Sequence, residues 1–153
     1  DRKTGNEKWR FNDSSGWFWA NPVVSNGIVL APSLDGVLYA LDQGSGQVLW
    51  TLPVGSPIVS MPVIIGEKFA LATLDGRVIV SDLKTGMEVG SCDLEKEIRS
   101  PLVSFDEYLI VSPEDGSLRL ISISSSGDLD EVWIYPLEED FLSPSDKLWE
   151  RAC

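Results

Sequence analysis

The sequence predicts an all-β fold, a partial β-propeller of about three four-stranded antiparallel blades plus one N-terminal strand of a preceding blade. Three observations predict it. Asp-Gly pairs recur every 40 residues, apolar runs rich in Val, Ile, Leu and Tyr flank each pair, and helix signals are few. An Asp-Gly pair between apolar runs is a strong hairpin signal, and four short strands repeated at about 40 residues are typical of a propeller blade. A β-sandwich is the alternative, but it would not need so regular a period.

The hairpin turns set the period of the repeat. They are Asp35-Gly36, Asp75-Gly76 and Asp115-Gly116. We expect type I′ turns here, with positive φ at both central residues. Three prolines, Pro22, Pro62 and Pro101, fall in step ahead of these hairpins. A second turn, "QGSG" in one repeat and "LKTG" in the next, leads to a fourth strand, which ends near Trp50 in the first repeat.

The repeat divides the chain into an outer strand of a preceding blade at 1–12, blade repeats at 13–55, 56–95 and 96–137, and a tail at 138–153. Because 1–12 lacks the other strands of its blade, the arc is incomplete as a fold. We expect a fragment of a longer polypeptide, a ring completed by a second copy or another chain, or an arc capped by its tail. In the tail, Ser143 and Pro144 favour a short helix; a capping arm and a frayed end are the alternatives.

Charge and composition argue against several classes of function. Acidic residues number 24 against 12 basic ones, so a surface of net charge −12 repels a phosphate backbone and we expect no nucleic-acid partner. We also expect no membrane span, because no apolar run reaches about 18 residues, and no signal peptide is visible. The chain has no histidine, and its two cysteines, Cys92 and Cys153, are far apart. Without the commonest general base or a zinc-site spacing, we expect no enzyme, no catalytic residue and no metal site.

An aromatic run precedes the first repeat's hairpin. Trp17 and Trp19 share one face of an extended segment, because successive side chains alternate between faces. Met61 and Arg99 lie beside the prolines of the later repeats. We interpret Trp17, Trp19, Met61 and Arg99 as the rim of a surface that binds a partner or a ring-shaped ligand. Packing between blades is the alternative.

The later repeats carry different residues at the two tryptophan positions. Counted from the prolines, the equivalents are Pro57 and Val59 in the second repeat, then Lys96 and Ile98 in the third. Trp17 is therefore unusually large for its place in the repeat.

The segment "ALDQGSGQVLW" resembles the docking motif of the pyrroloquinoline-quinone-type β-propeller repeat family, Ala-x-Asp-x-x-Thr-Gly-x-x-x-Trp. The matching residues are Ala40, Asp42, Gly46 and Trp50 in one copy, Asp1, Gly5 and Trp9 in an earlier copy, and Asp82 and Gly86 in a partial copy. In the partial copy Gly90 replaces the Trp, and in the third repeat extra residues delay the aromatic to Trp133. The indole supplies a large apolar area for packing between blades, so these residues are expected to be structural.

The resemblance covers about residues 1–137 and implies one of two kinds of function. Non-catalytic members include the propeller lipoprotein of the outer-membrane assembly machinery. The others are dehydrogenases that hold the quinone and a calcium ion on the propeller axis, beside a pair of adjacent cysteines.

Because this chain has no adjacent cysteines, the resemblance favours a non-catalytic binding scaffold without a cofactor. It implies an extracytoplasmic location and a protein partner, or a second copy, that completes the propeller. One alternative is that the chain is part of a quinone- and calcium-dependent quinoprotein dehydrogenase. The ectodomain or sensor module of a membrane protein is another.

Overall fold

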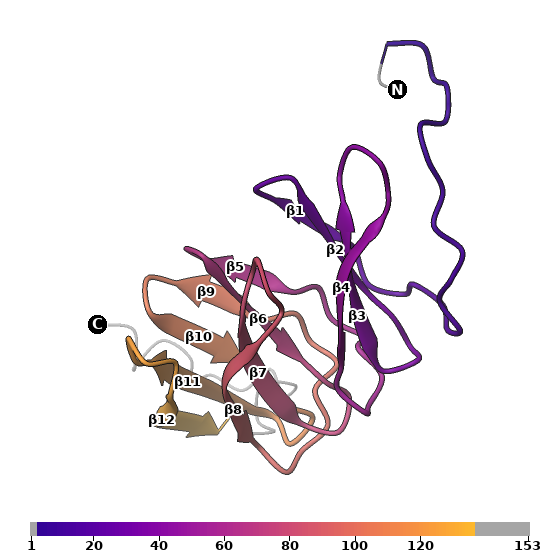
Figure 1. Cartoon of the computed structure of the whole chain (residues 1–153). Coiled ribbons are helices and arrows are strands. Elements are labelled where there is room, and N and C mark those ends of the chain that lie inside the picture. Colours follow the sequence, from indigo (N-terminus) through magenta and orange to yellow (C-terminus); the bar gives the residue numbers. More distant parts are fainter. Residues whose placement is uncertain (1–2, 137–153) are drawn as a thin grey trace.

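Three four-stranded antiparallel sheets stand side by side in an arc (Figure 1). The structure, a computed structural model, describes residues 3–136. The sheets comprise β1 (Val23–Ser25), β2 (Ile28–Pro32), β3 (Val37–Asp42) and β4 (Val48–Pro53); β5 (Val63–Ile65), β6 (Lys68–Ala72), β7 (Arg77–Asp82) and β8 (Glu88–Asp93); and β9 (Val103–Phe105), β10 (Tyr108–Val111), β11 (Ser117–Ile123) and β12 (Leu129–Pro136). Each sheet keeps its strands in chain order. The predicted fold class is confirmed.

The Asp-Gly turns join the second and third strands of each sheet, but they are not type I′ turns. Gly36 has φ +78°, whereas Asp35 does not have positive φ. The amide of Gly36 donates to the Ser33 carbonyl at 3.3 Å, and the Ser33 amide donates to the Val37 carbonyl at 3.2 Å. The hairpin therefore has three loop residues with glycine in the left-handed position, a common alternative to the two-residue turn. A turn with positive φ at both residues occurs instead at Asn26 and Gly27, between β1 and β2.

The first strands of the three sheets begin 40 residues apart, at Val23, Val63 and Val103. Pro101 therefore lies one position too early to match the other two prolines, and Leu102 fills their place. The prediction that the three prolines fall in step was wrong in the third repeat. The fold accepts a proline at either position, because both positions precede the strand and neither backbone amide needs to donate a hydrogen bond to the sheet.

The third-repeat equivalents of the two tryptophans change accordingly. The carbonyls of Trp17, Pro57 and Glu97 each accept a hydrogen bond, of 2.9, 2.8 and 2.9 Å, from the amide that precedes the following Asp-Gly pair. Glu97, not Lys96, is therefore the counterpart of Trp17, and Arg99, not Ile98, is the counterpart of Trp19.

The three extra residues of the third repeat leave the register of its outer strand unchanged. Trp50 lies opposite Ala40, Gly90 opposite Val80, and Trp133 opposite Leu120, each beside a register shift. The extra residues lengthen the β11–β12 hairpin at its turn. Trp133 consequently occupies in its sheet the position that Trp50 occupies in the first.

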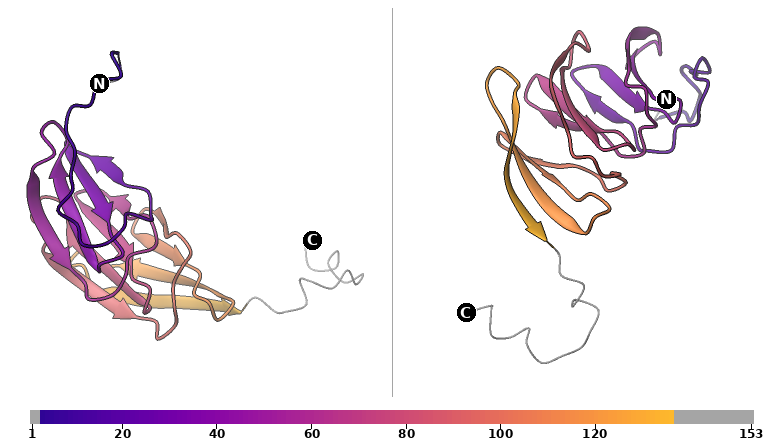
Figure 2. Two further views of the ribbon diagram at one scale, coloured as in Figure 1. Left: turned by 90° about the vertical axis from the view of Figure 1, so that its right-hand side faces the viewer. Right: turned by 90° about the horizontal axis from the view of Figure 1, so that it is seen from below.

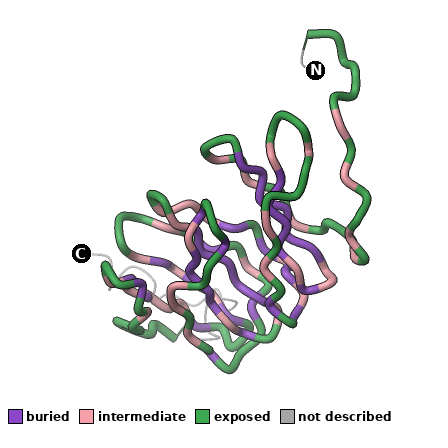
Figure 3. Tube along the Cα trace, in the orientation of Figure 1, coloured by how far each residue is buried: buried purple, intermediate pink, exposed green. Residues whose placement is uncertain are grey.

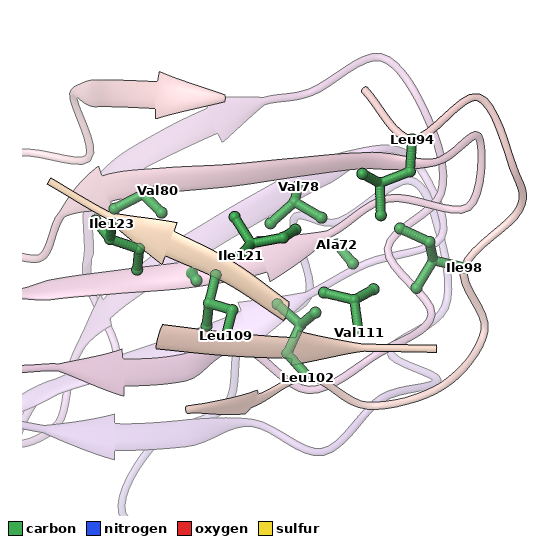
Figure 4. Close-up of a cluster of buried hydrophobic side chains, with 11 residues drawn as sticks. Ala72, Val78, Val80, Leu94, Ile98, Leu102, Leu109, Val111, Ile121 and Ile123 are labelled. Carbon is green, nitrogen blue, oxygen red and sulfur yellow. The ribbon is translucent and has the colours of Figure 1, made fainter. Parts of the chain in front are cut away.

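Apolar side chains between neighbouring sheets form the core. Figure 3 shows that the buried residues gather along the strands. One cluster lies between the first two sheets and includes Leu30, Leu38, Ala40, Phe69, Leu71 and Ile79, all 0% exposed. Another lies between the second and third sheets, where Ala70, Val78 and Val80 meet Leu109, Val111 and Ile121 (Figure 4). The second sheet thus uses one face against the first sheet and the other against the third.

The docking motif packs an indole on the turn glycine of the next sheet. A Cβ built on Gly46 would lie 2.5 Å from the Trp9 ring, and one built on Gly86 would lie 2.5 Å from the Trp50 ring; both glycines have φ +72°. Only glycine fits under the ring with this φ. Trp9 also donates its indole N–H to the Gln43 carbonyl at 3.0 Å.

The aspartates of the motif shape these turns. Asp42 accepts hydrogen bonds from the Ser45 hydroxyl and amide at 2.7 Å each, and Asp82 accepts the same pair from Thr85 at 2.8 Å each. These bonds, the hydroxyl first, lower the pKa of both carboxyl groups. Asp1, the first residue of the earlier motif copy, lies outside the described residues.

The next blade's backbone fills the place of the missing tryptophan in the second sheet. A Cβ on Gly90 would overlap the Gly127 carbonyl oxygen and lie 2.8 Å from its carbon. Gly127 in turn lies against Val89. The lengthened hairpin of the third sheet therefore lies directly on the bare backbone at Gly90.

Residues 3–12 form no strand; they run along one end of the arc, across the first sheet (Figures 1 and 2). Trp9 and Phe11 pack against Val29, Ala31, Tyr39 and Leu41 on the face of that sheet that no other sheet covers. The strand pairings of the described residues do not include 3–12. That 1–12 is an outer strand of a preceding blade stays a prediction, and the expected helix or arm at 138–153 lies outside the described residues.

Candidate functional site: a groove on the crossover face

Segments 13–22, 54–62 and 94–102 enter each sheet beside the Asp-Gly turns, and we call the surface they form with these turns the crossover face. Each later segment is held between two turns. The Val54 amide donates to the Gly36 carbonyl at 2.8 Å, and the Ile58 amide donates to the Ser33 carbonyl at 3.2 Å. The Pro57 carbonyl then accepts from the Leu74 amide. These backbone bonds make the face rigid, although it is built from loops.

Asp35 anchors the first crossover segment. Its Oδ2 accepts hydrogen bonds from the Tyr39 hydroxyl at 2.8 Å, the Ser14 hydroxyl at 3.1 Å and the Ser15 amide at 3.1 Å. A Cβ on Gly16 would overlap the Asp35 amide nitrogen, so the segment approaches the turn as closely as glycine permits. The aromatic run follows directly from this anchor.

Burial alone would raise the pKa of Asp35. Hydrogen bonds from the surrounding hydroxyls, that of Tyr39 foremost, outweigh burial and lower the pKa to about 2. The same contact acts oppositely on Tyr39, whose pKa is raised by burial and by the Asp35 carboxylate. The pair is therefore a fixed carboxylate and a neutral phenol at neutral pH, an anchor rather than an acid–base couple.

The aromatic run splits between two surfaces, as the alternation of side chains predicts. Phe18 turns toward the sheet, with its ring centre 6.1 Å from that of Phe11 and 6.0 Å from that of Tyr39. Trp17 and Trp19 turn outward and are 78% and 70% exposed. Trp17 is thus not packed between blades in the described part of the chain.

A groove of about 430 Å³ crosses all three repeats beside Trp19. Its lining consists of Trp19, Leu34, Pro57, Val59, Leu74 and Arg99. Trp19, Val59 and Arg99 hold equivalent positions in successive repeats, and Leu34 and Leu74 are the residues before successive Asp-Gly pairs. The lining is mostly apolar, with one cation.

Arg99 is held in place by two carboxylates. Its Nη2 lies 2.8 Å from Glu97 Oε2, and its Nε lies 2.6 Å from Glu114 Oε1. The hydrogen bond to Glu97 and the charge of Glu114 raise the pKa of Arg99. The groove therefore presents an oriented guanidinium at its third-repeat side, with two acidic neighbours.

The predicted rim residues are only partly brought together. Trp19 and Arg99 line one groove, whereas Trp17 and Met61, which is 38% exposed, lie on the surface without lining it. Leu34 and Leu74 were missed. The signal for them was present, because "SLDG" and "TLDG" repeat a leucine just ahead of a turn, and the structure leaves both leucines half-buried.

Residues 3–136 contain no cluster of three or more histidine, cysteine or acidic side chains placed to hold a metal ion. Within the same range no helix is long and apolar enough to cross a bilayer. Cys92, on β8, is a free thiol whose pKa burial raises to about 11. Such a thiol is protonated at neutral pH and is a poor nucleophile.

Over about two thirds of its length, the chain is similar to proteins named as outer membrane protein assembly factors. The chain is 31% identical over 103 residues to the outer membrane protein assembly factor BamB of Escherichia coli (strain K12), a match covering 67% of this chain and 26% of the relative. It is 32% identical over 99 residues to the protein of that name from Taylorella asinigenitalis (strain MCE3), covering 63% and 26%. The chain therefore spans about a quarter of these curated relatives.

Solved structures share the fold. BamB from Moraxella catarrhalis superimposes with a TM-score of 0.70 at 18% identity, over 84% of this chain and 39% of that one. The quinohemoprotein alcohol dehydrogenase of Comamonas testosteroni superimposes with a TM-score of 0.68 at 20% identity, over 80% and 21%. Identities this low show the propeller arrangement alone. The family model described as outer membrane protein assembly factor BamB matches residues 1–89, more than half of the chain, and the chain belongs to that family.

Proposed function

We propose that this chain is a non-catalytic, extracytoplasmic propeller scaffold that binds a partner protein of the outer-membrane protein assembly machinery through its crossover face. The observation that carries the proposal is the exposure of Trp17 and Trp19, at 78% and 70%, beside a preformed apolar groove. Tryptophan is strongly enriched among residues that dominate binding energy, and an exposed apolar patch can mark an interaction site.

Three further observations support a binding role over catalysis. The family carries the description of an assembly factor. The whole sequence lacks histidine, so a histidine general base is excluded. Asp35, the carboxylate with the most hydrogen-bond donors around it, is used to hold a loop. The likeness to a quinohemoprotein dehydrogenase extends to the fold alone.

The groove also indicates the chemistry of the partner segment. Trp19, Val59 and Leu74 offer an apolar wall, and Arg99 with its acidic neighbours offers a cation and two acceptors. An extended segment with an aliphatic anchor and a polar flank fits this pattern, because an apolar centre with a polar rim is the common anatomy of protein interfaces.

The binding partner for this test is the purified assembly complex, prepared without its own propeller subunit. Trp19→Ala should weaken binding of this chain to that complex by about tenfold or more, since a central aromatic anchor contributes over 1–2 kcal/mol. Titration calorimetry with wild type and variant measures this. Met87→Ala is the matched control, because Met87 is 69% exposed but lies at the β7–β8 turn, away from the groove. An equal loss of affinity in both variants, or no loss of affinity in Trp19→Ala, would contradict binding through the crossover face.

The non-catalytic part of the proposal has its own test. Added pyrroloquinoline quinone and calcium should elute separately from the protein on a sizing column, with no quinone absorbance in the protein peak. Stoichiometric quinone in that peak would favour the dehydrogenase alternative.

A further inference from the structure

The hairpin that joins β1 and β2 turns on an asparagine followed by a glycine, Asn26-Gly27 (Figure 1). Both residues are exposed, and both have positive φ, +50° and +79°. Positive φ at both central residues defines a type I′ turn, for which Asn-Gly is a favoured pair. No other asparagine in the sequence precedes a glycine.

An asparagine before a glycine can react with its own backbone. The main-chain nitrogen of the glycine attacks the side-chain amide carbon. A new C–N bond closes a five-membered imide ring, the nitrogen loses its proton, and ammonia leaves. Water then opens the ring at one of its two carbonyls, which gives either aspartate or isoaspartate, whose main chain is one methylene longer. Glycine hinders the attack least, because no side chain stands beside its nitrogen.

Ring closure requires a particular backbone angle at Asn26. The imide ring is flat and contains the Cα–C bond, so the Asn26 Cβ and the Gly27 nitrogen must eclipse each other about that bond. For an L-residue this places ψ at about −120°, the value of the first central residue of a type II′ turn, whereas type I′ has about +30°. The turn must therefore change from type I′ to type II′ before the ring closes.

The second and third sheets show that this hairpin also closes in the other form. Their β5–β6 and β9–β10 turns have two residues each, like the turn between β1 and β2. Gly66 and Asp106, the first residues of these turns, have φ +60° and +48°, but the glutamates that follow do not have positive φ. Positive φ at the first central residue alone is the pattern of a type II′ turn. At Gly27 either sign of φ is accessible, because glycine lacks a Cβ.

The peptide between Asn26 and Gly27 is free to turn over. Within residues 3–136 neither its carbonyl oxygen nor its amide takes part in a hydrogen bond. The hairpin is anchored one peptide further on, where the Gly27 carbonyl accepts from the Gln43 amide at 2.9 Å, as the equivalent carbonyls of the other sheets accept at 2.9 and 2.7 Å. Nothing lies within 4 Å of the Cβ position of Gly27. The change of turn type therefore leaves the anchor in place and meets no neighbour.

We propose that Asn26 is a site of spontaneous deamidation in the folded protein, reached through the turn form that the other two sheets adopt. The aspartate product keeps a residue that tolerates positive φ, so the turn survives. The isoaspartate product lengthens a two-residue turn that sets Ser25 opposite Ile28. This product consequently loosens β1, the strand into which the first crossover segment leads.

Incubation of the full chain in mildly alkaline buffer, followed by mass spectrometry, tests the site. Each chain should exchange one amide for a carboxyl group and release one equivalent of ammonia, with fragmentation placing the change, and isoaspartate, at Asn26. Alkaline buffer speeds the reaction because the attacking nitrogen must lose its proton. Asn21 is the internal control, because Pro22 has no N–H and the ring cannot close there. Asn26→Asp should abolish the release of ammonia and keep the turn.

The same incubation in urea gives the rate for a chain without the turn. The native rate should lie within about tenfold of it, since a change of turn type that costs about 1.4 kcal/mol lowers the reactive fraction about tenfold. A slower native rate would mean that the turn protects Asn26, and would overturn the proposal. A change shared equally with Asn12, which precedes Asp13, would overturn it as well. The purified isoaspartate form should unfold at a lower urea midpoint than Asn26→Asp, and equal midpoints would contradict the loosening of β1.

Discussion

At the scale of single residues, one carboxylate anchors the first segment of the crossover face. Asp35 collects donors from the β3 tyrosine and from the serines ahead of the aromatic run, so a side chain in a turn orients a loop that is distant in sequence. The other two Asp-Gly turns use their aspartates differently. Asp75 accepts from Thr73, and Asp115 pairs with Arg119 at 2.6 Å.

Asp35→Asn should destabilise the protein at neutral pH by about 1–2 kcal/mol, a value discounted for the partial exposure of the site. Because the folded pKa of about 2 lies below the ordinary 3.8, the carboxylate stabilises the fold above about pH 4 and ceases to do so as the pH falls toward 2. Urea unfolding of both proteins at pH 7, 4 and 2 should therefore show a difference that shrinks with acidification. Asp106→Asn, at an exposed turn residue with φ +48° that asparagine suits, is the control and should show no such trend. A difference that is constant with pH would contradict the assignment.

At the scale of elements, the joint between the second and third sheets differs from the one before it. The first joint buries an indole over a glycine, and the second brings two backbones together at Gly90 and Gly127. The longer β11–β12 hairpin occurs together with glycine at position 90. The hairpin fills the space that a larger side chain at this position would take, as close packing of the interior requires. The third sheet's hairpin therefore packs on Gly90 through its backbone, where the first joint has an indole on a glycine.

Gly90→Ala should lower the free energy of unfolding by about 1–3 kcal/mol, the usual cost of forcing a group into a packed site. Strand propensity alone predicts the opposite sign, since glycine weakens a strand interior. The urea midpoint relative to wild type measures the effect. Gly44→Ala, in an exposed turn where the nearest atom is an Asp42 carboxylate oxygen at 3.3 Å, is the matched substitution. A stability for Gly90→Ala equal to or above that of wild type would show that the hairpin moves away freely.

At the scale of the whole molecule, the charge of −12 opposes compactness. Acidic residues outnumber basic ones two to one, 24 against 12, and only some of them are paired with a cation in the described residues. Surface repulsion of this kind acts over the Debye length, which salt shortens from about 30 Å at 0.01 M to about 8 Å at 0.15 M. The same repulsion acts between two copies of the chain.

The melting temperature should therefore rise by a few degrees when NaCl is raised from about 0.01 to 0.15 M, because screening relieves self-repulsion more than it weakens exposed ion pairs. Thermal unfolding followed by circular dichroism checks this at one low protein concentration, which separates it from association. A melting temperature that falls with salt would mean that the surface ion pairs outweigh the net charge.

The local features of this protein were readable from its sequence alone. The spacing of Asp-Gly pairs predicts the hairpins, and the docking motif predicts that Trp50 packs on a neighbouring blade, as it does on Gly86. Turn residues and apolar alternation act over a few neighbours, so one repeat carries the instructions for one blade. The same reasoning separated Trp17 and Trp19 from Phe18, whose ring lies beside those of Phe11 and Tyr39.

Contacts between repeats were decided only by the tertiary structure. The prolines misaligned the third repeat by one residue, and the structure shows that Arg99 is the counterpart of Trp19 and that the leucines before the turns complete the groove. The sequence identifies Trp133 as the delayed aromatic of the third repeat, and the structure adds that it keeps the register of Trp50 and that Gly90 leaves room for Gly127. The sequence determined the blades because their hydrogen bonds close within 40 residues. The groove and the joints between sheets depend on how one blade meets the next, which pairing within a blade does not specify.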